Sequence, residues 1–219
     1  MKKQILYCLL FVLLNADKTY AQSLPDNDRQ IWLTTAFEQS LAKTWKVGNE
    51  EEFRLGNDLT RLYYFHSEFN LTFRAKKYLQ LGGGYRQVFE RKSIVWLAEQ
   101  RPFIFATVNG NWHGTALSNR SRLEYRLREA STKQLRYRNK STAVLPWQFT
   151  HWHIRPFLAD ELFLDLTAGN IQRNRLFAGI QCKLSSGIGL EGYYLLQTSR
   201  SGNGWQSFHA LGTKLRFNL

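Results

Sequence analysis

The sequence predicts an all-β protein, a single antiparallel transmembrane β-barrel that follows an N-terminal signal peptide. Two observations carry this prediction. Polar and apolar residues alternate with a period of two along most of the chain, and the helical period of 3.6 is hard to find. The chain also begins with the pattern of an export signal and ends on a strictly alternating segment. The alternation indicates strands with one apolar face, and the two ends favour a barrel in a bacterial outer membrane.

The first 21 residues have the three-part layout of a secretory signal peptide. Lys2 and Lys3 form a positive start, residues 5–14 form an apolar run, and Ala21 offers a small residue to signal peptidase. The apolar run is too short for a membrane-spanning helix, which needs about 20 residues. We therefore expect residues 1–21 to be removed on export and residues 22–219 to form one outer-membrane barrel domain.

Eleven alternating segments follow the signal. They are residues 31–42, 44–56, 60–75, 78–91, 94–109, 114–128, 133–145, 148–166, 171–185, 187–199 and 205–219. In the third segment, Tyr63 and Phe65 are expected on the apolar face, opposite His66 and Glu68. Short and longer links alternate, and the last segment runs towards the rim with the short turns, as in bacterial transmembrane barrels. Because such barrels carry an even number of strands, we predict about 12 strands, with 10 as the alternative.

The last nine residues alternate strictly. Leu211, Leu215 and Phe217 fall on one face, whereas Lys214 and Arg216 fall on the other. A chain that ends on such a strand resembles outer-membrane barrels whose C-terminal strand is a targeting signal, although here the aromatic residue stands two positions before the end. We therefore expect the barrel-assembly machinery to bind this strand.

Alternation alone does not tell which face of a strand is outside, because a soluble barrel hides its apolar face and a membrane barrel presents it to lipid. The polar face carries Gly82, Gly84 and Gly179, and a crowded interior needs such residues. Tryptophan and tyrosine residues cluster towards the segment ends, where aromatic girdles lie. These features favour a membrane barrel. A secreted soluble barrel that binds an apolar ligand is the alternative.

Short motifs across the exported part carry a family resemblance. They are Trp32 and residues 51–54 (Glu-Glu-Phe-Arg), 81–86 (Leu-Gly-Gly-Gly-Tyr-Arg), 122–126 (Arg-Leu-Glu-Tyr-Arg), 136–138, 160–163, 174–179 and 192–194. Their order and spacing resemble a family of small bacterial outer-membrane β-barrel proteins, domain of unknown function 2490. The resemblance implies the barrel fold and the outer-membrane location. The family has no established activity, so the resemblance implies no site residues.

The densest polar feature is a run of basic residues at inward positions of successive strands. The expected basic cluster is Arg120, Arg122, Arg126, Arg128, Arg136, Arg138, His151, His153, Arg155 and Arg175, and its expected acidic partners are Glu52, Glu68, Glu124, Glu161 and Glu191. Arginine offers several donors to carboxylates, so one prediction is a ladder of ion pairs that fills the barrel. Because cations are in excess, the other prediction is a narrow pore that favours anions.

A membrane-embedded lipid hydrolase is the alternative activity. Such an enzyme needs a nucleophile, a base and an orienting group. His66 precedes Ser67, but the two point to opposite faces of a regular strand, and no Gly-x-Ser-x-Gly elbow occurs. His151 and His153 share a face but have no convincing third metal ligand. We therefore expect no catalytic residue, no metal and no cofactor.

The charge balance suggests anionic partners. The formal net charge is +13, yet the chain contains no glycine-rich phosphate loop, and the expected location argues against nucleic acid. We expect a monomer whose rims contact outer-membrane lipid and lipopolysaccharide and whose lumen meets small anionic solutes. Cys182 is the only cysteine after the signal peptide, so no intrachain disulfide can form.

Overall fold

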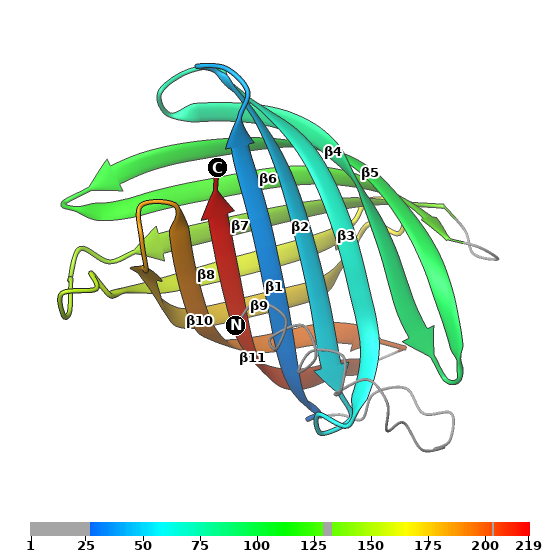
Figure 1. Ribbon diagram of the computed structural model, residues 1–219. Coiled ribbons are helices and arrows are strands. Elements are labelled where there is room, and N and C mark those ends of the chain that lie inside the picture. The colour runs from blue at the N-terminus through cyan, green and yellow to red at the C-terminus, as the bar shows by residue number, and fades with distance from the viewer. Residues whose placement is uncertain (1–26, 129–132, 203) are drawn as a thin grey trace, which may run out of the picture.

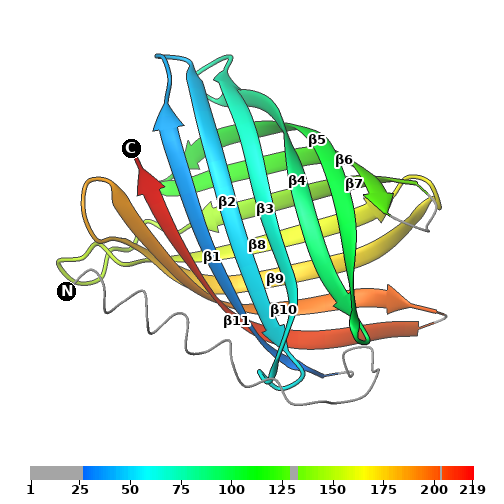
Figure 2. The same cartoon turned by 45° about the vertical axis from the view of Figure 1, so that its right-hand side comes forward.

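The computed structural model describes residues 27–128, 133–202 and 204–219, and the predicted signal peptide lies outside these residues. The described residues form eleven strands that close into a barrel in sequence order (Figures 1 and 2). The strands are β1 (Arg29–Ser40), β2 (Trp45–Gly56), β3 (Arg61–Arg74), β4 (Leu79–Lys92), β5 (Val95–Trp112), β6 (Thr115–Arg128), β7 (Gln134–Val144), β8 (Arg155–Asp165), β9 (Asn170–Lys183), β10 (Ile188–Ser201) and β11 (Gly204–Asn218). The eleven predicted segments match these strands closely, except that β8 begins later than expected.

The barrel closes where β1 meets β11, and these two strands run parallel. Arg29 pairs with His209 and Glu38 with Asn218, and the other neighbouring strands pair antiparallel. The prediction of 12 strands, or of 10, was therefore wrong. An even number is needed only where the first and last strands pair antiparallel, and a parallel ladder satisfies the same backbone groups in a barrel of eleven.

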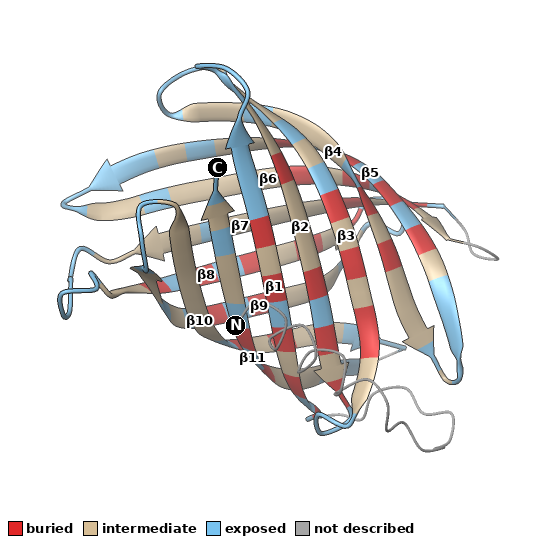
Figure 3. Ribbon diagram, viewed as in Figure 1, coloured by how far each residue is buried: buried red, intermediate tan, exposed pale blue. Residues whose placement is uncertain are grey.

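The links between strands define two rims. The C-terminal rim carries the end of β11 and the links 41–44, 75–78, 113–114, 145–154 and 184–187, and the N-terminal rim carries the start of β1 and the other five links. The longest link, residues 145–154, lies on the C-terminal rim, where short turns were expected. Figure 3 shows exposed residues at the hairpins and buried residues along the middle of the strands.

Glycines on the inward face of β4 let two aromatic rings lie close to the strand. Gly84 pairs with Phe103 of β5, and Gly82 pairs with Phe105. A Cβ atom on Gly82 would lie 2.5 Å from the carbonyl oxygen of Leu71 and 2.5 Å from the ring of Phe105. These glycines are therefore needed for the close approach of backbone and ring, as the sequence predicted for a crowded interior.

A β-bulge in β3 changes the predicted face of one tyrosine. The register between β2 and β3 shifts at Leu55, which pairs with Leu62, whereas Arg54 pairs with Tyr64. The extra residue is Tyr63, and both Tyr63 and Tyr64 are buried. Tyr63 therefore does not share the outward face of Phe65, because a bulge breaks the period of two.

The lumen has two unlike walls. β1 and β8–β11 form a wall that we call the apolar wall, because Trp32, Phe157, Phe177 and Leu195 are buried together on it, although Glu161 and Arg175 are also buried there. β2–β7 form a charged wall. Its buried charged residues are Glu52, Arg54, Glu68, Arg86, Glu99, Arg101, Arg122, Glu124, Arg126 and Arg136.

The outward face is largely apolar. Large hydrophobic side chains are exposed on β1–β6 and on β8–β11, among them Phe53, Phe69 and Leu211. The polar side chains on this face bond to one another: Nδ2 of Asn119 donates to Oδ1 of Asn139 at 2.9 Å. None of the described residues forms a helix with the length and hydropathy that a membrane span requires.

Candidate functional site

Two buried glutamates in the lumen each bind three arginines. Their partners are Arg122, Arg136 and Arg138 for Glu124, and Arg101, Arg126 and Arg128 for Glu99. The Glu124 side chain is fully buried, and its Oε1 lies 2.7 Å from Nη1 of Arg138. A carboxylate accepts several such charge-assisted hydrogen bonds, so each glutamate ties neighbouring strands together.

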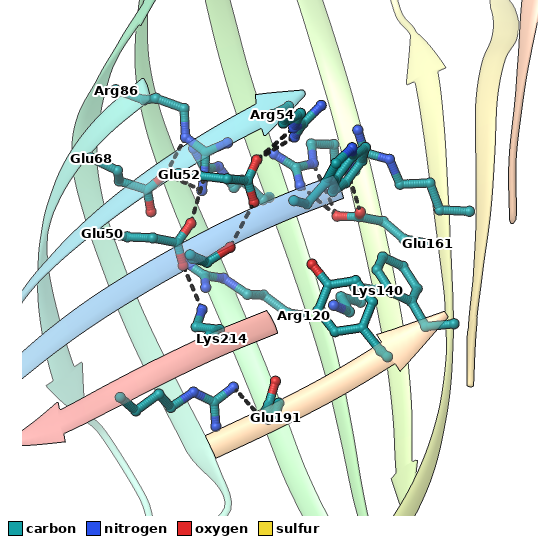
Figure 4. Close-up of a pocket in the computed structure, with 18 of the residues that line it drawn as sticks. Glu50, Glu52, Arg54, Glu68, Arg86, Arg120, Lys140, Glu161, Glu191 and Lys214 are labelled. Carbon is teal, nitrogen blue, oxygen red and sulfur yellow. Dashed lines mark hydrogen bonds and ion pairs between the residues drawn. The ribbon is translucent and has the colours of Figure 1, made fainter. Parts of the chain in front are cut away.

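Four arginines form a layer across the lumen, which we name the arginine partition. They are Arg54, Arg86, Arg138 and Arg175, and each of them lines a chamber on both sides of the layer. Their ion pairs are Arg54–Glu52 at 2.5 Å, Arg86–Glu68 at 2.5 Å, Arg138–Glu161 at 2.6 Å and Arg175–Glu161 at 3.3 Å. Figure 4 shows the partition arginines Arg54 and Arg86 beside their glutamates. The partition divides the lumen into two chambers.

Trp32 anchors the partition on the apolar wall. The guanidinium carbon of Arg54 lies 3.6 Å from the centre of the Trp32 ring, and that of Arg175 lies 4.7 Å from it. The indole Nε1 donates to Oε1 of Gln30 at 2.9 Å. Stacking on an aromatic face stabilises a guanidinium group and fixes its plane. The apolar wall therefore supports two of the four partition arginines.

The N-terminal chamber is the larger of the two and has a volume of about 470 Å³. Within the part of the chain that the structure describes, its lining comprises ten arginines, Lys92 and a single acidic residue, Glu90. Among the described residues, Arg61, Arg91 and Arg173 have no carboxylate oxygen within 4.0 Å. Nε of Arg173 donates instead to the hydroxyl of Ser199 at 3.0 Å. This chamber is strongly basic.

The C-terminal chamber is smaller, with a volume of about 170 Å³. Its lining carries both signs of charge and the aromatic residues Trp32, Phe157, Phe177 and Tyr193. The charged side chains are Glu50, Glu52, Glu68, Glu161 and Glu191, with Arg54, Arg86, Arg120, Arg122, Arg138, Arg175, Arg216, Lys140 and Lys214. In Figure 4, labelled basic and acidic side chains from different strands point into this chamber.

Most of the predicted basic cluster lies inside the barrel. Arg122, Arg126, Arg136 and Arg175 are buried, and Arg120, Arg128 and Arg138 are half-buried. Arg155 lies at the C-terminal rim, where its guanidinium group donates to the carbonyl oxygens of residues 144 and 145 rather than to a carboxylate. The acidic residues Glu52, Glu68, Glu124 and Glu161 are buried and ion-paired, and Oε1 of Glu191 lies 2.7 Å from Arg216.

The two predicted histidines of the cluster do not lie in the lumen wall. His151 and His153 are exposed in the link before β8. The amide of Phe149 donates to the carbonyl of Ile154, and Thr150 and His153 have positive φ angles, so the chain turns here. His151 and His153 are two residues apart, which is the spacing of residues on one face of a strand, but β8 begins only at Arg155.

Several lumen residues were outside the predicted basic cluster and its expected acidic partners. Glu50, Glu99, Arg101, Lys140 and Lys214 all contribute charged groups to the interior. Glu99 and Arg101 stand two residues apart, and this spacing places both on the same face of a strand. That signal was available in the sequence. The pairing of Lys214 with Glu50 at 2.5 Å was not, because it depends on the seam between β1 and β11.

The geometry does not bring His66 and Ser67 together. His66 faces the lumen, where its Nε2 lies 3.3 Å from Glu50. The Ser67 hydroxyl is on the outward face and donates to Glu51 at 2.6 Å. The described residues also contain no group of three or more histidine, cysteine, aspartate and glutamate side chains that could hold a metal ion.

Fold and lumen define the class of protein: a closed β-barrel with an ion-paired interior and a largely apolar outer face. Residues 29–208 match the family described as Protein of unknown function (DUF2490). The match covers most of the chain, so the protein belongs to this family, as the sequence motifs predicted. No curated protein matches the chain.

Proposed function

We propose that this protein spans the outer membrane of a Gram-negative bacterium and admits small anions into its lumen. The membrane part of the proposal is supported by the distribution of side chains. Of the buried residues in the described part of the chain, nineteen are polar or charged and thirteen are hydrophobic, while large hydrophobic residues are exposed around the barrel. In a water-soluble domain the buried residues are mostly apolar, so the distribution here is the reverse of the soluble pattern. A barrel in lipid requires this arrangement.

Exposed aromatic residues near both rims also support a membrane location. Trp45, Trp112 and Trp147 lie at the C-terminal rim, and Trp96 and Trp205 lie at the N-terminal rim. Tryptophan is enriched where a membrane meets water, because its ring is apolar and its N–H group is polar. The two groups would mark the two membrane interfaces.

The basic N-terminal chamber is the observation that carries the anion part of the proposal. Among the described residues its lining holds one acidic residue, Glu90, and the lining arginines Arg61, Arg91 and Arg173 form no ion pair, so these three supply uncompensated positive charge. A cleft of one charge sign with low-dielectric walls concentrates ions of the opposite sign. Anions would therefore enter from the N-terminal rim and be slowed at the arginine partition, which limits passage.

Ion conductance in planar lipid bilayers tests this function. We expect the purified protein to conduct weakly and to prefer chloride over potassium, because the partition narrows the lumen and the entrance is basic. The double variant Glu52→Ala/Arg54→Ala removes one partition arginine together with its carboxylate, so no buried charge is left without its partner. It should raise the conductance and keep the preference for anions.

The matched control is Glu38→Ala/Lys46→Ala, which removes an exposed ion pair of 3.3 Å outside the partition. Its conductance should equal that of the unchanged protein. A preference for cations, or equal conductance of the two double variants, would overturn the anion proposal. Extraction from cells without detergent would overturn the membrane proposal and would favour the soluble barrel.

A further inference from the structure

Two cations of the C-terminal chamber form no direct ion pair. Among the described residues, no carboxylate oxygen lies within 4.0 Å of Arg120 or Lys140. The other lysine of this chamber, Lys214, lies 2.5 Å from Glu50, and Arg216 lies 2.7 Å from Glu191. Arg120 and Lys140 are labelled in Figure 4, where both face the chamber.

These two cations stand directly opposite each other on neighbouring strands. Arg120 of β6 pairs with Lys140 of β7 in the antiparallel register. Side chains at such positions start about 5 Å apart, and like charges placed there repel each other. Lys140 also stands opposite Glu161 of β8, but Glu161 binds Arg138 and Arg175. Among the described residues, neither Arg120 nor Lys140 has a carboxylate oxygen within 4.0 Å.

Aromatic rings keep both cations in place. The guanidinium carbon of Arg120 lies 4.0 Å from the centre of the Phe105 ring, and Nζ of Lys140 lies 4.1 Å from the centre of the Phe177 ring. Nε of Arg120 is buried and has no hydrogen-bond partner. A ring attracts a cation but accepts no hydrogen bond of normal strength from it, so these donors stay available.

We propose that Arg120 and Lys140 form a binding site for a phosphate-sized dianion. A guanidinium group presents a planar fork of donors to two oxygens, and an ammonium group adds a point charge with three donors. A dianion between the two would neutralise both charges and accept hydrogen bonds from both. The chamber volume of about 170 Å³ suits one phosphate group and a small substituent.

This site is separate from the basic N-terminal chamber. The two cations lie on the other side of the arginine partition and line only the C-terminal chamber. Dianion binding depends on the proposed function only in that anions have to reach the lumen. Equilibrium binding to the detergent-solubilised barrel measures this site without conduction, so the two proposals can fail separately.

Isothermal titration calorimetry with inorganic phosphate, in buffer with 0.1 M chloride, tests the site. We expect one phosphate per barrel. Arg120→Gln and Lys140→Met should each weaken binding at least tenfold. Arg120→Lys and Lys140→Arg keep the charge and should retain most of the affinity, so a merely structural effect of the first pair is recognised. Arg61→Gln changes an unpaired arginine of the other chamber and is the matched control.

Ligand choice distinguishes the sources of the anion. Glycerol phosphate that binds as tightly as inorganic phosphate would assign the site to phosphate monoesters, and weaker binding would assign it to the free ion. Sulfate should compete, because it has the same shape and charge.

The site proposal has clear failure results. Migration on gels with and without boiling shows that each variant is folded. Absence of detectable phosphate binding in 0.1 M chloride, or unchanged affinity in both folded charge-removing variants, would overturn the proposal. An anion-selective conductance together with any of these results would leave the proposed function standing and reject the dianion site alone.

Discussion

The two chambers share the arginine partition but differ in how their charge is balanced. In the N-terminal chamber, Glu99 and Glu124 bind lining arginines but do not themselves line the chamber. The carboxylates that balance these arginines therefore lie behind them, away from the chamber surface. In the C-terminal chamber, five glutamates reach the lining themselves, and the uncompensated charge is concentrated at Arg120 and Lys140. The position of the carboxylates, rather than the number of arginines, therefore decides the character of each chamber.

This difference separates two tasks. A diffuse positive surface attracts anions of many kinds, and its effect falls as salt screens it. A pair of fixed donors selects a ligand by geometry and charge. The N-terminal chamber has the features of an entrance, and the C-terminal chamber has those of a binding site.

The largest effect is expected from removal of the carboxylate behind the N-terminal chamber. Glu124→Ala should lower the free energy of unfolding by about 3–5 kcal/mol, because buried guanidinium groups lose their partner. Unfolding in urea, followed by tryptophan fluorescence in micelles, measures the change. Glu38→Ala, whose partner Lys46 is exposed, should cost less than about 1 kcal/mol. Similar losses in both variants would show that the buried lattice does not stabilise the chamber.

An intermediate effect is expected where the wall supports the C-terminal chamber. Gly82→Ala places a Cβ atom against the Leu71 carbonyl and the Phe105 ring, and should cost about 1–3 kcal/mol. The Phe105 ring lies against the guanidinium group of Arg120, so a shift of the ring should lower the phosphate affinity as well. In Gly192→Ala the new Cβ atom meets no atom within 4 Å, and both quantities should stay unchanged. Unchanged phosphate binding in Gly82→Ala would show that the position of the Phe105 ring does not affect the phosphate site.

The smallest effect on stability is expected at the entrance. Arg61→Gln should change the free energy of unfolding by less than about 0.5 kcal/mol, because Arg61 has no carboxylate partner. The ratio of chloride to potassium permeability in bilayers should nevertheless fall. Arg29→Gln, at an exposed position of the same rim, should leave the ratio unchanged. Equal ratios in the two variants would contradict the role of the chamber as an entrance.

The strands could be predicted from sequence because inward and outward residues alternate, and this local pattern survives almost everywhere. It fails where the chain departs from a regular strand. Tyr63 sits at a bulge, and His151 and His153 repeat at the right interval inside a turn. The strand number depends on how β1 meets β11, and no local pattern records that pairing.

The candidate site could be predicted only in outline. Inward arginines and glutamates were recognisable by spacing, but which of them pair depends on the register of neighbouring strands. Arg120 was expected in the basic cluster, yet its lack of a carboxylate becomes visible only with its position opposite Lys140. The membrane location and the anion preference stay predictions that the experiments above can test.

The parallel seam has a consequence for how the protein assembles. Each seam pair joins residues 180 positions apart, as Arg29 and His209 do. Ordering such a long loop is entropically costly and slow compared with forming hairpins. Until the seam forms, β1 and β11 each present an unpaired edge that can recruit another chain. A partly made barrel is therefore an open sheet prone to aggregation, and closure of the seam is the step that an assembly factor would have to protect.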